Sequence, residues 1–125
     1  MFEELVNEYI SSAETAASVD CSDKKSVRRF NASADRMRAI VDEVVGLGQD
    51  AILAFTCLLD KEPAATWVAH HLVEKAELDT ATLSRCFSRV EQAMIDARAK
   101  GDLANAMGEE MWLKEWKAMK ATSQH

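Results

Sequence analysis

The chain has 125 residues and a formal net charge of −6, from 15 Lys and Arg against 21 Asp and Glu. Its 48% hydrophobic content can form one core, and 4 Gly with 1 Pro are few turn formers for a sheet protein, which favours one helical domain. The acidic charge excludes a general nucleic-acid binder, because phosphate neutralisation needs an excess of Lys and Arg. We therefore expect a single domain, residues 1–125, of the all-α class.

A cytoplasmic location is expected from three features of the sequence. The longest apolar stretch, 51–59, is far shorter than the ~20 residues that a bilayer requires. The N-terminus carries Glu3 and Glu4 where a secretory leader would be basic. The three cysteines are odd in number and widely spaced, which indicates reduced thiols.

Apolar residues that recur at three- and four-residue steps predict helices along the whole chain. The first helix occupies residues 1–20, and Ser22 is the expected N-cap of the next helix. The second apolar stripe extends over 27–45, and 31–33 can interrupt it, so one long helix and two shorter helices both remain open. The glycines of 46–48 are the predicted stop signal.

The central part of the chain is the most apolar. The third helix, over 51–59, is nearly all apolar and is expected to be buried on most sides. Pro63 suits the first position of a fourth helix, because its fixed φ angle is already helical. That fourth helix carries His70 and His71.

Two further helices complete the prediction. Asp79 or Thr80 caps the fifth helix, Gly101 ends it, and the sixth helix extends over 102–120, followed by a disordered tail at 121–125. Short connections after the second helix favour antiparallel neighbours, so 22–120 is predicted to form stacked helix pairs. The inward side chains expected on the sixth helix are Leu103, Met107, Trp112, Leu113, Trp116 and Met119.

No catalytic or metal-binding residue is predicted. His70 and His71 point about 100° apart on a helix, so they cannot bind one metal ion together, and Glu74 completes only half of a site. Cys57 and Cys86 lie in apolar patterns and are interpreted as buried, unreactive thiols. No cofactor-binding motif, phosphate loop or nucleophile elbow occurs.

Charge is unevenly distributed at the N-terminal end. Residues 1–23 contain six acidic residues and no Lys or Arg, whereas 24–38 contain six basic residues and Asp35. Attraction between two antiparallel helices of opposite charge is the simplest interpretation. An interaction surface is the alternative.

Two tryptophans lie four residues apart, Trp112 and Trp116, and therefore share one face of the last helix. Side chains of this size usually anchor a terminal helix to the core. Partly exposed tryptophans beside acidic residues are, however, also typical of binding hot spots.

The chain from Asn31 to Trp116 resembles a group of small bacterial HEAT-like helical proteins of unknown function. The resemblance is carried by Asn31, Met37, Ile40-Val41, Gly48, Leu58-Leu59, Trp67 to Leu72, Gly101, Ala106 and the Trp112 to Lys117 ending. An arginine usual in that family at the start of the fourth helix is replaced here by Ala65-Thr66. The resemblance implies a HEAT-like superhelix and a non-catalytic binding protein, since such proteins are often encoded beside polymorphic toxins and look like immunity proteins.

The leading hypothesis is an immunity protein that neutralises a cognate bacterial toxin, which an acidic surface would attract if the toxin is basic. The expected partner-binding residues are Glu62, Asp102, Glu109, Glu110, Trp112 and Trp116. One alternative is a HEAT-like adaptor that binds a peptide or helix in a groove between helix pairs. A small metal-dependent enzyme using His71 and Glu74 is the least favoured alternative.

Overall fold

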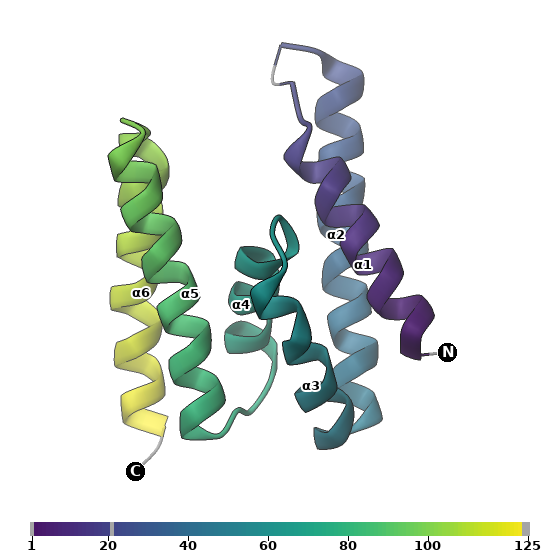
Figure 1. The fold of residues 1–125 in the computed structure, drawn as a ribbon, viewed down its shortest axis with the longest axis vertical. Coiled ribbons are helices and arrows are strands. Elements are labelled where there is room, and N and C mark those ends of the chain that lie inside the picture. Colours follow the sequence, from purple (N-terminus) through teal and green to yellow (C-terminus); the bar gives the residue numbers. More distant parts are fainter. Residues whose placement is uncertain (1, 21, 124–125) are drawn as a thin grey trace.

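The computed structural model describes residues 2–20 and 22–123, and this part of the chain is helical without any strand (Figure 1). The all-α class predicted from the sequence is confirmed. The elements are α1 (Phe2–Ala17), α2 (Lys24–Leu47), α3 (Gln49–Phe55), the 3-10 turn η1 (Thr56–Asp60), α4 (Ala64–Lys75), α5 (Thr80–Ala99) and α6 (Leu103–Ser123).

The first two helices are joined by a turn whose capping residue differs from the prediction. Asp23, not Ser22, is the N-cap of α2, because its carboxylate accepts a hydrogen bond from the backbone N–H of Lys25 at 3.0 Å. The Ser22 hydroxyl donates instead to the carboxylate of Asp20. Helix α2 continues without interruption for 24 residues, which settles the choice between one helix and two.

The other boundaries follow local chemistry. Gly48 ends α2 with a φ angle of 109°, a conformation that suits only glycine. Asp79 caps α5 by accepting from the N–H of Thr82 at 2.7 Å. Pro63 lies one residue before α4 rather than inside it. Helix α6 reaches Ser123, so the predicted tail is helical at 121–123, and 124–125 lie outside the described residues.

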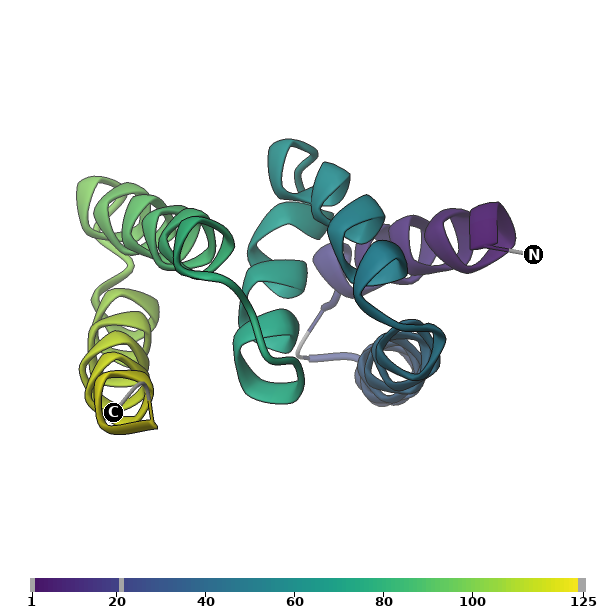
Figure 2. The same ribbon diagram turned by 90° about the horizontal axis from the view of Figure 1, so that it is seen from below.

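The helices form three antiparallel pairs: α1 with α2, α3 and η1 with α4, and α5 with α6 (Figure 1). Seen from below, α1, α3 and α5 form one layer and α2, α4 and α6 form the other (Figure 2). Predicted stacking of helix pairs agrees with this arrangement. Within the described residues, no helix combines the length and apolarity needed to span a membrane.

The core is centred where the first two pairs meet. Tyr9 of α1 and Phe55 of α3 are fully buried and contact edge to face, with ring centroids 5.1 Å apart. The same core contains Met37 and Ile40 of α2 and Leu72 of α4. These contacts fix α4 against the N-terminal pair, and α5 packs on its other side.

The opposite charges of α1 and α2 attract each other directly. The Arg36 guanidinium of α2 donates to both carboxylate oxygens of Glu8 of α1, with Nη2 and Oε2 2.8 Å apart. The pKa of Glu8 is lowered, chiefly by this hydrogen bond. The structure thus supports the interpretation of the charge pattern as a contact between neighbouring helices.

Several apolar side chains are exposed, contrary to the sequence prediction. Cys57 was expected in the core, but the tight η1 turn places it at the surface, whereas Cys86 is buried as predicted. On α6, Leu103, Met107 and Met119 were expected to face inward and are 61%, 60% and 48% exposed. Helix α6 is apolar on two faces and only one of them has a neighbour, so the pattern could not identify the inner face.

Candidate functional site

A cleft of about 790 Å³ lies between the first and last helix pairs, with α4 from Thr66 to Glu74 as its floor. Helix α4 has 12 residues against 24 in α2 and 21 in α6, so it is about 18 Å long beside neighbours of roughly 36 and 32 Å. The short central helix is therefore recessed between two long ones (Figure 1). This difference in helix length creates the cleft.

The cleft has an aromatic side and walls of small residues. Phe30 of α2 and Trp67 of α4 contact each other with ring centroids 5.9 Å apart, and both are only partly buried. Ala16 and Ala17 of α1 contribute to one wall, and Ala93 and Ala97 of α5 contribute to the opposite one. Short alanine side chains leave room that larger residues would fill.

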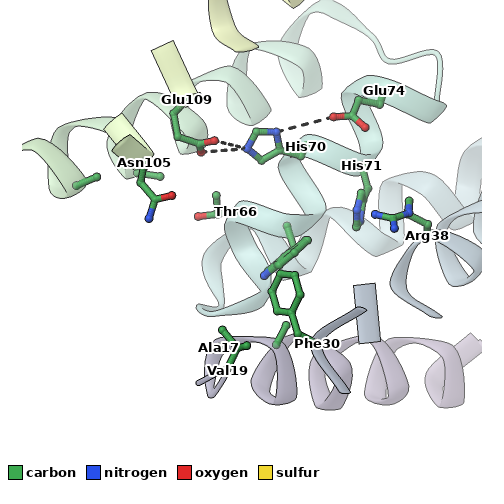
Figure 3. A pocket seen from close by; sticks show the side chains of 14 residues that line it. Ala17, Val19, Phe30, Arg38, Thr66, His70, His71, Glu74, Asn105 and Glu109 are labelled. Carbon is green, nitrogen blue, oxygen red and sulfur yellow. Dashed lines mark hydrogen bonds and ion pairs between the residues drawn. The ribbon is translucent and has the colours of Figure 1, made fainter. Parts of the chain in front are cut away.

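Charged groups of both signs surround this apolar surface (Figure 3). Arg38 lines the cleft from α2, whereas Glu74 and Glu109 line it from α4 and α6. His70 lies between the two acids: its Nε2 is 3.0 Å from both carboxylate oxygens of Glu109, and its Nδ1 is 4.0 Å from Glu74. This histidine therefore links α4 to α6 across the cleft.

The His70 cluster does not have the geometry of a metal site. Its two ring nitrogens face different carboxylates, so the three side chains cannot converge on one ion (Figure 3). Among the residues that the structure describes, no group of three His, Cys, Asp or Glu side chains is arranged to hold a metal.

His71 faces the core beside the cleft. Its Nδ1 is 2.8 Å from the Tyr9 hydroxyl, and both side chains are buried. Burial, reinforced by the nearby positive charge of Arg38, lowers the pKa of His71 to about 4. The imidazole is therefore neutral near pH 7, and in its Nε2–H tautomer Nδ1 accepts the hydrogen bond that Tyr9 donates. The hydrogen bond fastens α1 to α4 directly beneath the cleft.

The acidic residues expected to bind a partner are exposed or half-buried, but each has a structural contact. Glu62 accepts from the N–H of Thr66 and caps α4. Asp102 accepts from the N–H and the side-chain amide of Asn105 at the start of α6. Glu110 pairs with Arg98 at 3.1 Å. Only Glu109 lines the cleft.

The two predicted tryptophans lie in the seam between α6 and its neighbours. Trp112 donates its indole N–H to Glu74 at 2.8 Å and packs against the rings of His70 and Phe87. Trp116 packs against Trp112, with ring centroids 6.2 Å apart, and both are half-buried. Their main contribution is to hold α6 in place. Trp112 also contacts His70 and Glu74, which line the cleft.

Sequence reasoning missed Trp67, Phe30 and Arg38 as cleft residues. Phe30 falls within the apolar stripe over 27–45, and Trp67 lies in the predicted fourth helix. No local signal distinguishes a side chain at the edge of a cleft from one in the core, since both follow the same helical period. The recess depends on the length of α4 relative to α2 and α6, which becomes informative only when the helices are packed.

Comparison with known proteins gives no assignment: neither a protein-family model, nor a curated protein, nor a solved structure matches the chain.

Proposed function

We propose that this protein is a non-catalytic binding protein that holds a segment of a partner protein in the cleft over α4. The supporting observation is the cleft itself, whose volume of about 790 Å³ lies within the ~300–1,000 Å³ of typical ligand sites. It combines an apolar surface with a few charged groups. Such sites obtain affinity from apolar contact and orientation from polar contacts.

The chemistry of the cleft specifies the segment. Trp67 and Phe30 provide a surface for an apolar side chain of the partner. Glu109, on the α6 side of the cleft, can attract a Lys or Arg, and Arg38, on the α2 side, can attract a carboxylate in addition to its ion pair with Asp35. A segment with an apolar residue between a basic and an acidic one therefore fits best. The opposite order of charges would be disfavoured, since like charges would meet.

The test is selection from a random peptide library on the purified protein, followed by affinity measurements. We expect enrichment of peptides with the basic–apolar–acidic pattern. Ala97→Trp should abolish binding because it fills the cleft wall, whereas Ala99→Trp, on the exposed end of the same helix, should leave binding unchanged. The proposal would be contradicted if the selected peptides shared no common pattern, or if Ala97→Trp and Ala99→Trp bound the selected peptides equally well.

A second candidate is an immunity protein that neutralises a toxin, in line with the family resemblance. It is favoured by the exposure of Glu62, Asp102 and Glu110, which remain accessible to a basic protein despite their internal contacts. Binding of this kind should weaken strongly as salt rises. The affinity of a segment bound in the aromatic cleft should depend less on salt concentration.

Measuring the affinity for an identified partner at increasing salt concentration distinguishes the two candidate functions. A toxin encoded beside this protein should be captured at low salt, and Glu62→Gln combined with Glu110→Gln should weaken that capture. Ala97→Trp should not affect it. Loss of capture in Ala97→Trp alone would favour the cleft instead.

A further inference from the structure

A second hollow, of about 380 Å³, lies between η1 and the outer side of α5 and shares no lining residue with the cleft. It is lined from α5 by Ser84, Arg85, Ser88, Arg89 and Gln92, and from η1 by Leu59 and Asp60. On α5 these residues include two Ser-Arg pairs that are four residues apart, about one turn of the helix. All five α5 side chains therefore face the same hollow.

The hollow is rich in hydrogen-bond donors. Its lining from α5 carries two guanidinium groups, two hydroxyls and one amide, of which the Gln92 amide already donates to Asp96 at 2.9 Å. The single carboxylate in its lining, Asp60, is 84% exposed in its side chain and 3.8 Å from Arg85 Nη2. In a protein with a net charge of −6, this is a local concentration of positive charge.

Arg89 is the unusual member of the group. Its Nε atom is buried and has no hydrogen-bond acceptor among the described residues, and its guanidinium forms no ion pair with them. A buried donor without an acceptor is unfavourable. Arg85 and Arg89 are also like charges at positions i and i+4 of one helix, an arrangement that is unfavourable as well. Within the described chain, Asp60 offsets the charge of Arg85 only from 3.8 Å, and no acceptor reaches Arg89 Nε.

We propose that this hollow binds a phosphate-type oxyanion, either as a free phosphate monoester or as a phosphorylated side chain of a partner. A dianion between the two arginines would accept from their terminal guanidinium nitrogens, place an acceptor beside the buried Arg89 Nε and relieve the repulsion between the guanidinium groups. Guanidinium forks match phosphate oxygens in geometry, and the Ser84 and Ser88 hydroxyls can donate to the remaining oxygens. A nucleic-acid backbone is disfavoured because the whole molecule is acidic.

The inference is tested by titrating the full chain with inorganic phosphate while recording the ¹⁵N-resolved Nε–H signals of arginine. The Arg89 signal should shift with a saturable dependence on phosphate, and chloride at equal ionic strength should leave it in place. Arg89→Gln and Ser88→Ala should each weaken binding, the first by at least about tenfold, as loss of a charged hydrogen bond implies.

Arg98→Gln is the matched control, because it removes the same charge from an exposed position on the same helix. It should leave phosphate binding unchanged. A linear, unsaturable shift, or equal weakening by Arg98→Gln and Arg89→Gln, would show only general charge attraction and overturn the proposal. Thermal unfolding of each variant verifies that it is folded, and Ser88→Ala provides the test if Arg89→Gln is not.

A phosphoserine peptide distinguishes the two sources of the ligand. Binding of this peptide at least about tenfold tighter than inorganic phosphate, with no binding of the unphosphorylated peptide, would identify a phosphorylated partner. Equal affinity for the peptide and for inorganic phosphate would show that the phosphate group alone is recognised, as expected for a small free phosphate ligand. Binding of neither ligand would refute the site, while the proposed function of the cleft would remain unaffected.

Discussion

Mild acid should destabilise this protein through His71. The imidazole is 4% exposed and forms a hydrogen bond with the Tyr9 hydroxyl of α1, which it accepts in the Nε2–H tautomer. Its other neighbours are Arg38 and Asp42 on α2 and His70 and Lys75 on α4, and only Asp42 favours the protonated form. Protonation would put a charge into the core and remove the acceptor of the Tyr9 hydroxyl.

The magnitude follows from the two pKa values of His71. Burial lowers the pKa to about 4 in the folded protein, against about 6.5 in the unfolded chain. Near pH 7 the His71 side chain is largely neutral in both the folded and the unfolded state, so its titration hardly changes the free energy of unfolding. As the pH falls below the unfolded value, the unfolded state takes up a proton that the folded state does not. The free energy of unfolding should therefore decrease by about 2 kcal/mol between pH 7 and pH 5.

Urea unfolding at a series of pH values measures this decrease. His71→Gln should remove most of it, because glutamine does not titrate but can still accept the hydrogen bond from Tyr9. His70→Gln is the matched control, one residue away on α4, and should retain the decrease. The same pH dependence in His71→Gln as in the wild type would refute the burial of a neutral His71.

Three further predictions concern the helices and the thiols. Gly48→Ala should lower the free energy of unfolding by about 1–3 kcal/mol, since the φ angle of 109° at Gly48 suits glycine. Gly46→Ala should raise it by about 0.5–1 kcal/mol, because Gly46 lies inside α2 with open space around it. Thermal unfolding of the two variants compares these effects. Leu113→Ala should cost about 2–5 kcal/mol in urea unfolding, because Leu113 is 5% exposed, and a cost near zero would show that α6 is not packed through it. A thiol reagent should modify the exposed Cys57 in the native protein but the buried Cys86 only after unfolding, as peptide mapping would show. Burial also raises the pKa of the Cys86 thiol to about 11, which keeps it protonated. Equal rates of modification at the two thiols would contradict this packing.

The sequence by itself determined the elements that depend on local chemistry. The 3.6-residue period of apolar side chains predicted the helical class, and Asp79 and Gly48 marked two of the boundaries correctly. Opposite charge on consecutive segments predicted their pairing, which Glu8 and Arg36 carry out. Each of these signals lies within a few residues or between helices that are neighbours in the sequence. The local sequence was therefore sufficient to predict these features.

Only the tertiary structure decided which apolar faces are covered and which residues meet. Met107 and Leu113 lie on the same helix and are both apolar, yet one is exposed and the other buried because α5 covers a single side of α6. His70 and Glu109 are 39 residues apart and meet because α4 and α6 flank one cleft. A helical period specifies a face but not its neighbour, and a recess between long helices arises only when a short one is packed between them.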